Sequence, residues 1–462
     1  NERTTVATAA AFAQFVNGAE ILGNHYGMNN AVQMVANMAD PVSGDLGQIL
    51  DRLPNADDTS TRATFNTLAN MVAACVANSD NCEQLLAAAT PVAGTQPATV
   101  LQALANTTRF AGSVAVSDLF DLSQHNSTFA PALDEAPTSW LLFIKFTGGF
   151  YSDYAPSNLM SGPGNLAFDE VGNAWINDNY VPTAALGPNE EGTPLSKVSC
   201  AGQRLIKVYP WGENFPDSPY YGAGLSGAGF GITIDTEGKI WIGNFGFESP
   251  LCANMAVPPF PDPSNQIPAR HNSVSVFNSD GSAISPDIVG FNQGEISWPQ
   301  ATLADDQDNI WLANCGSDSV TIIPAGQTDE AYNIRLPGAG VIGESPALKP
   351  FAMSIDPQGR AWVTGNKAGW NGMAGAPAGR VYRVELDGTV TVLPHQTGKH
   401  PISILSWPMG ISGDSQGNMW VSNSDAVNVP CIDPLVSIQS TIGPRVSVSF
   451  TVTSASSSKS CV

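Results

Sequence analysis

The stretch Gly229-Phe-Gly-Ile-Thr-Ile-Asp235-Thr-Glu-Gly238-Lys-Ile-Trp241-Ile decides the fold of most of this chain. Its apolar run before the Asp predicts one strand, and the Trp-Ile pair begins a second. Between them, the Asp side chain bonds turn amides and the Gly takes the positive φ of a hairpin turn. A single hairpin of this kind cannot cover both of its faces, so the pattern predicts a repeat protein.

The same pattern recurs in order along the chain. The second copy has Gly229 where the others have Pro, and the third has Asp308 where the others have Gly. Further strand-like runs follow most copies, as four-stranded blades require, and the copies start about 50 to 70 residues apart. Such repeats bury their faces by stacking into a ring, which predicts a β-propeller. The five copies are 163–175, 229–241, 299–311, 350–362 and 408–420.

The first 135 residues follow a different period. Apolar residues recur there at steps of three and four, and Pro- and Gly-containing breakers separate the stripes. We therefore predict an α+β multidomain chain, with a small all-α bundle of five or six helices at 1–135 and an all-β propeller at 138–462. The apolar run 140–146 is predicted to close the last blade. The alternating segment 438–453 is predicted to form a sixth, degenerate blade, so we favour six blades over five.

Composition excludes some functions. The formal net charge of −22 disfavours a phosphate backbone, and the 19 Lys and Arg residues are scattered singly, so nucleic acid is not an expected partner. No run reaches the roughly 18 apolar residues that a membrane-spanning segment needs. The chain starts at Asn1 without an initiator Met, which suggests a processed N-terminus that once followed a signal segment.

Seven cysteines, none at zinc-binding spacing, favour disulfides in an oxidising compartment. We predict a secreted, extracellular or cell-envelope protein. Cys315 is left as the unpaired residue. The predicted pairs are Cys75–Cys82, Cys200–Cys252 and Cys431–Cys461.

The five Asp-x-x-Gly-x-x-Trp copies make residues 138–425 resemble NHL-type propellers, in particular virginiamycin B lyase-like and secreted bacterial NHL-repeat proteins. The resemblance implies a propeller fold and an extracellular location. It does not imply one reaction, because such propellers serve as lyases, lactonases and binding platforms.

Long insertions fall on one face of the predicted propeller, which makes that face the candidate working surface. One insertion carries Trp370 and Asn371, an exposed pair suited to sugar or peptide contact. The residues three positions beyond each Trp converge near the channel mouth, where their oxygens suit Ca²⁺ or Mg²⁺. The alternative is that these side chains cap strand ends. The metal candidates are Asp178, Asn244, Asn314 and Asn423.

A lyase-like reaction on this face would need a His base and acidic ligands. His271 ends one insertion, and Glu295 and Glu344 lie in connections on the same side. Their spacing forms no motif. The leading hypothesis is therefore a binding or assembly module for a protein partner, a glycan or a second copy of the chain. The alternative is a metal-dependent lyase or lactonase acting at the channel mouth.

Overall fold

The chain folds into two compact units in the computed structural model. The first unit is Asn1–Phe150 with Phe168–Trp175 and Lys207–Pro216, and the second is the remainder. The structure describes residues 1–18, 20–23, 25–145, 163–180, 201–226, 231–246, 251–252, 266–267, 271–287, 289–339, 348–366, 380–393, 408–413, 418–423, 435–440 and 448–451.

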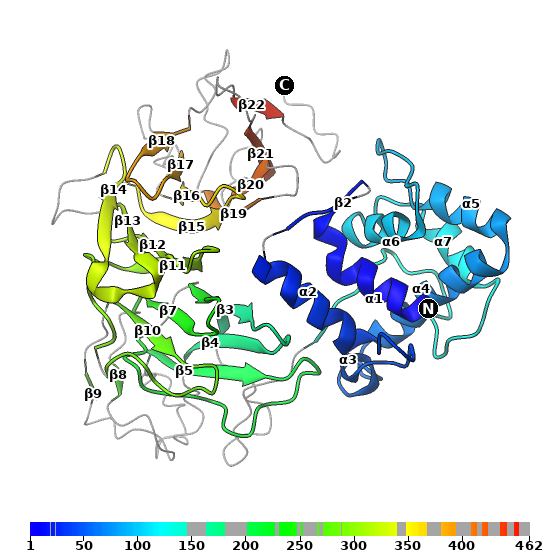
Figure 1. Cartoon of the computed structure of the whole chain (residues 1–462), viewed down its shortest axis with the longest axis horizontal. Helices are drawn as coiled ribbons and strands as arrows, with labels where there is room; N and C mark the ends of the chain where they lie inside the picture. The colour runs from blue at the N-terminus through cyan, green and yellow to red at the C-terminus, as the bar shows by residue number, and fades with distance from the viewer. Residues whose placement is uncertain are drawn as a thin grey trace, which may run out of the picture. The chain divides into compact units, whose positions relative to one another are not determined.

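The N-terminal region is helical, as the three- and four-residue periodicity predicts. Its described part contains seven α-helices rather than five or six, and a two-stranded sheet of β1 (Val16–Asn17) and β2 (Glu20–Ile21), which corrects the prediction of an all-α bundle. Side-chain caps begin three of the described helices: Asn1 accepts from the Thr4 amide, Asn78 from the Asp80 amide and Thr99 from the Gln102 amide. Most residues of α4 (Thr61–Ala77) are buried, and its Phe65 is fully buried in the core. No helix in the described part of the chain combines the length and apolarity needed to cross a bilayer. The helices are α1 (Glu2–Phe12), α2 (His25–Met38), α3 (Gln48–Asp51), α4 (Thr61–Ala77), α5 (Ser79–Ala88), α6 (Val100–Arg109) and α7 (Val116–Ser123) (Figure 1).

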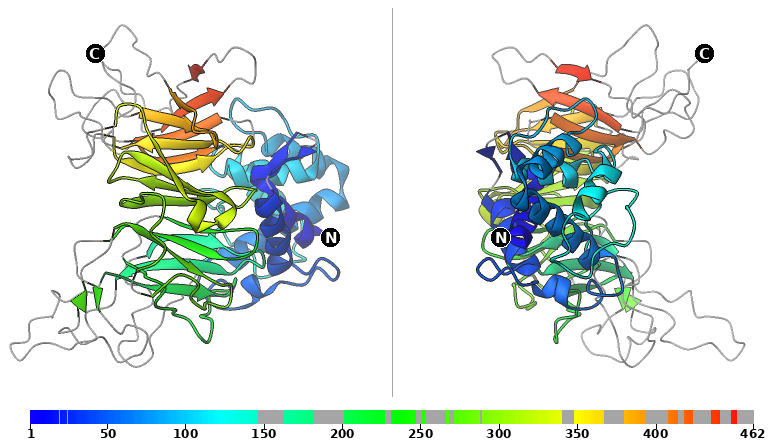
Figure 2. Two further views of the ribbon diagram at one scale, coloured as in Figure 1. Left: turned by 60° about the vertical axis from the view of Figure 1, so that its left-hand side comes forward. Right: turned by 90° about the vertical axis from the view of Figure 1, so that its right-hand side faces the viewer.

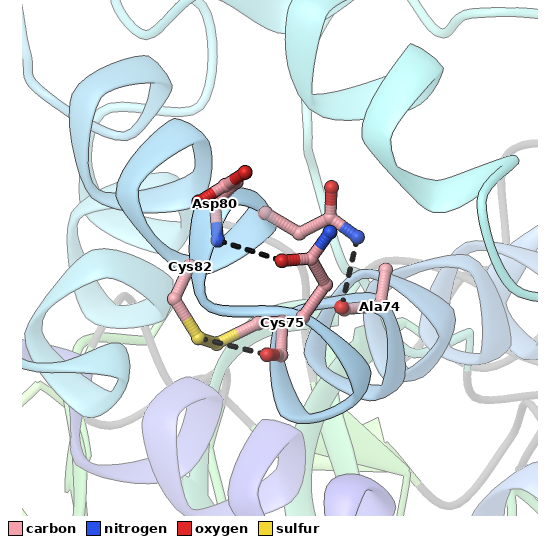
Figure 3. The surroundings of a disulfide bond; sticks show 6 residues. Ala74, Cys75, Asp80 and Cys82 are labelled. Atoms are coloured by element: carbon pink, nitrogen blue, oxygen red, sulfur yellow. Dashed lines mark hydrogen bonds between the residues drawn. A yellow bond between two sulfur atoms is a disulfide. The ribbon is translucent and has the colours of Figure 1, made fainter.

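A disulfide joins Cys75 at the end of α4 to Cys82 in α5, which confirms the predicted pairing. Figure 3 shows it beside two hydrogen bonds that fix the sharp turn between the helices. Asn78 accepts from the Asp80 amide at 3.0 Å, and Asn81 donates to the Ala74 carbonyl at 3.0 Å. The other two predicted pairs stay predictions, because Cys200, Cys431 and Cys461 lie outside the described residues.

The run 140–146 does not close a blade in its described part, residues 140–145. Trp140 is 1% exposed and belongs to the core of the helical region. Its amide donates to the Ala111 carbonyl, and the Lys145 amide donates to Asn55 Oδ1. The apolar run that predicted a strand has two side chains, Leu141 and Phe143, that are exposed. Helices, rather than a sheet, cover its inward face, which corrects the prediction.

Antiparallel sheets follow, each beginning with one copy of the repeat. The sheets occur in chain order, and a two-stranded sheet of β8 (Leu251–Cys252) and β9 (Gln266–Ile267) lies within the second insertion. The sheets are β3 (Pro163–Phe168), β4 (Ala174–Tyr180) and β5 (Ala201–Val208); β6 (Ile232–Ile234), β7 (Ile240–Asn244) and β10 (Ser273–Phe277); β11 (Pro299–Ala304), β12 (Ile310–Asn314), β13 (Ser319–Ile323) and β14 (Tyr332–Arg335); β15 (Pro350–Ile355), β16 (Ala361–Gly365), β17 (Arg380–Val384) and β18 (Val390–Val392); and β19 (Pro408–Gly413), β20 (Asn418–Asn423), β21 (Leu435–Ser440) and β22 (Val448–Thr451).

The first strand of each sheet lies at an edge of that sheet, and β6, β11, β15 and β19 contact one another in sequence. Figures 1 and 2 show β11, β15 and β19 in successive sheets, coloured from green to orange. This arrangement is consistent with a propeller-like β domain. Strands β21 and β22 extend the fifth sheet, so segment 438–453 does not start a sixth one where it is described. Five repeat-bearing sheets are present among the described residues.

Each described repeat turn is held by one Asp side chain, as predicted, and by a bond that was not predicted. In the third copy, Asp305 Oδ1 accepts from the Gln307 and Asn309 amides. Its Oδ2 accepts from the Trp311 indole at 2.9 Å. The carboxylate therefore joins the turn to the following strand. The equivalent indole bonds are Trp175–Asp169, Trp241–Asp235 and Trp362–Asp356, at 3.1, 2.8 and 2.8 Å.

Candidate functional site

Asn244 and Asn314 lie three positions beyond Trp241 and Trp311. Their side-chain oxygens accept hydrogen bonds within their own sheets. Asn244 Oδ1 accepts from the Ser226 amide at 2.8 Å, and its Nδ2 donates to two serine hydroxyls of β10. Asn314 Oδ1 accepts from the Ser297 amide at 3.1 Å, in the same relation to the next sheet. Both side chains are fully buried. Each bonds the segment that leads into the first strand of its sheet, which is the strand-capping alternative.

Asp178 has a different partner. Its carboxylate forms a buried ion pair with Arg204, whose Nε donates to Oδ2 at 2.6 Å. The side chain of Asn423 is outside what the structure describes. Within the described ranges, no group of three His, Cys, Asp or Glu side chains has metal-binding geometry. Metal binding by the four candidates stays a prediction.

His271 lies in an aromatic cluster that joins the second and third sheets. Its imidazole stacks on the Trp298 indole, with ring centroids 3.9 Å apart and planes 2° from parallel. Phe245 meets the same indole edge-on at 5.1 Å. The His271 Nδ1 lies 2.8 Å from the Phe245 carbonyl oxygen. A carbonyl only accepts, so Nδ1 donates this bond, and Nε2 is the ring nitrogen left to act as an acceptor.

Trp298 has a left-handed backbone, with φ of 51°, and Lys349 has φ of 50° at the equivalent position of the next sheet. Each residue precedes the Pro that starts its sheet. The Trp298 carbonyl accepts from the Cys315 amide, and the Lys349 carbonyl accepts from the Asn366 amide, both at 3.0 Å. Left-handed backbone costs a bulky residue about 1–3 kcal/mol, so the surrounding contacts must hold these conformations.

Cys315, whose amide bonds the Trp298 carbonyl, is a free thiol. Burial raises the pKa of the Cys315 thiol to about 11, against the lowering effect of the nearby Lys349 ammonium. At neutral pH the thiol is therefore protonated and a poor nucleophile. The prediction that Cys315 is unpaired is confirmed.

We call Phe245, His271, Trp298, Cys315 and Lys349 the rim. They follow or precede strand ends at one common end of three sheets, where Asn244 pairs with Ser273 and Asn314 with Pro299. Only His271 was a predicted catalytic residue.

The remaining predicted residues lie apart from this cluster or outside the described residues. Glu295 is exposed with φ of 53°, and no recorded bond joins it to His271. Glu344, Trp370 and Asn371 lie outside the described residues.

Sequence reasoning missed Trp298 as a rim residue. A signal for it exists, because Ser-Trp-Pro occurs at 297–299 and again at 406–408, each time where a repeat begins. The pairing of His271 with Trp298 had no such signal, since 26 residues separate the two in the chain.

No protein-family model matches this chain, and no curated protein matches it in sequence. Solved structures do resemble it. Virginiamycin B lyase from Staphylococcus aureus is 12% identical, with 63% of this chain and 85% of that chain covered and a TM-score of 0.31. A putative 6-phosphogluconolactonase from Bacteroides uniformis is 11% identical, with coverage of 64% and 72% and a TM-score of 0.37. An auxiliary nutrient binding protein from Bacteroides ovatus is 9% identical, with coverage of 58% and 57% and a TM-score of 0.36.

Proposed function

We propose that this chain is a secreted or cell-surface binding module that engages a protein, a glycan or a second copy of itself through the rim. The observation that carries the proposal is the aromatic stack of His271 on Trp298. Trp298 holds a costly backbone conformation, and the residue is partly exposed. Rigid aromatic anchors with little entropy to lose are what binding surfaces concentrate.

The oxygens of Asn244 and Asn314 support a binding role over metal-assisted chemistry at these positions. Both already accept a main-chain N–H within their own sheets. Withdrawing either oxygen to bind a cation would leave a buried amide without a partner, at about 1–3 kcal/mol.

The location belongs to the same proposal. The Cys75–Cys82 disulfide supports an oxidising compartment, because such bonds are rare where thiols are kept reduced. The acidic net charge of −22 supports partners other than nucleic acid.

The test compares a rim variant with a variant at the opposite end of the sheets. The full chain is immobilised and exposed to material secreted by its source, and bound macromolecules are identified by mass spectrometry. Trp298→Gly should lose the bound partner, since glycine removes the anchor while accepting the left-handed backbone. Self-association of the free chain is measured in parallel by sedimentation, and it too should depend on Trp298.

Thr236→Ala is the matched control, because Thr236 lies in the repeat turn at the far end of the second sheet. It should retain both properties. A partner that Trp298→Gly still binds, or a wild-type chain that captures nothing and stays monomeric, would overturn the proposal.

Catalysis is the second candidate, and one observation favours it. His271 Nδ1 is held by the Phe245 carbonyl at 2.8 Å, which orients Nε2 as a proton acceptor. A lyase or lactonase using His271 as base would lose activity in His271→Phe, which keeps the ring stacked on Trp298. Lactone opening and elimination would be assayed with and without added Ca²⁺ or Mg²⁺. Activity in the variant equal to that of wild type would exclude this candidate.

A further inference from the structure

The first strands of three sheets begin in the same way. After the initial Pro, the register of β15 and β19 shifts by a bulge, and the freed N–H is bound by a side chain two residues beyond the repeat Trp. A bulge re-aims nearby side chains and leaves a group of the ladder unpaired, so this bond completes the local structure. The three bonds are Asn165 N–H to Asn177 Oδ1, Ala352 N–H to Thr364 Oγ1 and Gly410 N–H to Ser422 Oγ.

The second and third sheets lack this side-chain bond. The residues two beyond Trp241 and Trp311 are Gly243 and Ala313, and neither has a side chain that hydrogen-bonds. Strand β11 nevertheless has the bulge, located between Pro299 and Ala301. The region between β6–β7 and β11, which we call the seam, is therefore built differently from its counterparts.

Two buried polar atoms in the seam have no hydrogen-bond partner. Gln300 is 6% exposed and its Oε1 is unpaired, and Thr302 is 2% exposed with an unpaired Oγ1. A Cβ built at Gly231 would lie 2.4 Å from Thr302 Oγ1, and one at Gly243 would lie 2.7 Å from it. These glycines let the two sheets approach closely at Thr302.

Gln300 is polar and large, unlike the residues at the same position of the other repeats. The other repeats have Gly164, Phe230, Phe351 and Met409 at this position, five residues before the repeat Asp. A buried unpaired acceptor destabilises the fold, whereas an apolar residue of similar volume does not. A polar residue at a place where the fold accepts Phe or Met indicates a use other than packing.

The rim cluster lies at the same end of this strand. Trp298 is two residues before Gln300, and it contacts His271 and Phe245 from the neighbouring sheet. This end of the two sheets carries two hydrogen-bond acceptors, Gln300 Oε1 and His271 Nε2, and the rings of Trp298 and Phe245. A ligand that matches them supplies hydroxyl donors and an apolar C–H face, and it carries no charge. Sugars and polyols have this chemistry.

We propose that the seam binds a neutral sugar or polyol, with Gln300 and His271 accepting its hydroxyl protons and Trp298 covering its C–H face. This names the ligand class of the rim and rests on the proposed binding function. Binding would pair the Gln300 oxygen that the free protein leaves unsatisfied. In this proposal the unpaired Gln300 oxygen is the acceptor for a hydroxyl group of the ligand.

The test titrates the full chain with individual neutral monosaccharides, disaccharides and glycerol, read by calorimetry and by saturation-transfer NMR. At least one sugar should bind saturably to wild type. Gln300→Met, which keeps the volume and removes the acceptor, should weaken that sugar about tenfold. His271→Phe, which keeps the stacked ring, should weaken it by a similar factor.

Stability gives a second readout that a purely structural role would not produce. Without sugar, Gln300→Met should unfold at higher urea concentration than wild type, because an unpaired buried oxygen is removed. Thr364→Val is the matched control in the next sheet, where the hydroxyl is paired. It should unfold at lower urea concentration and bind sugar as wild type does.

The proposal is overturned if no sugar binds wild type, or if Gln300→Met and His271→Phe both bind as tightly as wild type. If no sugar binds but Trp298→Gly still abolishes capture of a macromolecule, the sugar site is wrong and the binding function stands. If Trp298 proves irrelevant to capture while the sugar still binds at Gln300, the macromolecular part of the proposed function fails instead.

Discussion

Trp311 and Trp298 belong to the same sheet, yet they lie at opposite ends of it in contrasting environments. Trp311 is fully buried, and its indole donates to Asp305 at 2.9 Å. Trp298 is partly exposed, has φ of 51° and stacks on an imidazole. The turn end satisfies its polar groups locally, whereas the rim end retains strained backbone and an unpaired acceptor. Satisfied polar groups are therefore concentrated at the turn end, in keeping with the proposed use of the rim for binding.

The largest expected effect separates these two tryptophans. Trp311→Ala should lower the free energy of unfolding by about 3–5 kcal/mol, through the cavity it leaves. Trp298→Gly should change it by no more than about 1 kcal/mol, because lost stacking is offset by relief of the left-handed strain. Urea unfolding followed by circular dichroism measures both. Equal losses in the two variants would contradict the contrast drawn here.

An effect of intermediate size is expected for the Asp residues of two repeat turns. Their contributions to stability depend on pH. Burial raises the pKa of Asp356, but hydrogen bonds from Arg360 and Trp362 outweigh it, so the net pKa is lowered. Burial also raises the pKa of Asp235, and there the bonds from Trp241 and Lys239 do not compensate. The two carboxylates therefore affect stability with opposite sign as pH changes.

The direction of each pH effect on stability follows from comparing the folded pKa with that of an unfolded Asp, about 3.9. The contribution of Asp356 is present above that pH and is lost as the pH falls through the lower folded pKa. The contribution of Asp235 is present below that pH and is lost as the pH rises through the higher folded pKa. Measured from pH 3 to 7, the advantage of wild type over Asp356→Asn should grow, and its advantage over Asp235→Asn should shrink. Parallel profiles would show that the two turns are equivalent.

The smallest expected change in stability concerns Asp308, which occupies the turn position where the other repeats have Gly. Asp308 replaces Gly and has φ of 61°, and its carboxylate accepts from the Thr236 amide and hydroxyl in the preceding sheet at 2.7 and 2.5 Å. Asp308→Gly relieves strain and loses these bonds, so we expect a change within about 1 kcal/mol. A double-mutant cycle with Thr236→Ala should give a coupling of about 0.5–1.5 kcal/mol. A coupling of zero would mean that the contact contributes nothing.

Local chemistry made the hairpins readable from the sequence. The Asp that bonds turn amides, the Gly with positive φ and the apolar strands all lie within about 13 residues of one another, and the structure confirms them in the described copies. The helices of the N-terminal region were predicted for the same reason. The Cys75–Cys82 disulfide was also a local prediction, across seven residues.

The candidate functional site was harder to predict from the sequence than the hairpins. Asn244 and Asn314 were placed correctly at strand ends, but the sequence left metal binding and strand capping open, and their bonded partners lie elsewhere in the chain. The apolar run 140–146 predicted a strand without identifying what covers it. Apolar side chains have no directional preference, so the same pattern suits a sheet or a helical core.

The sequence by itself determined the repeat, its turns and the helical start, since each depends on neighbours along the chain. Tertiary structure alone decided that His271 stacks on Trp298, that Trp140 joins the helices and that Gln300 is left without a donor. These outcomes depend on which surfaces meet after folding. Contacts between distant segments are selected by shape and by the pairing of buried polar groups, and no local pattern of residues records that selection.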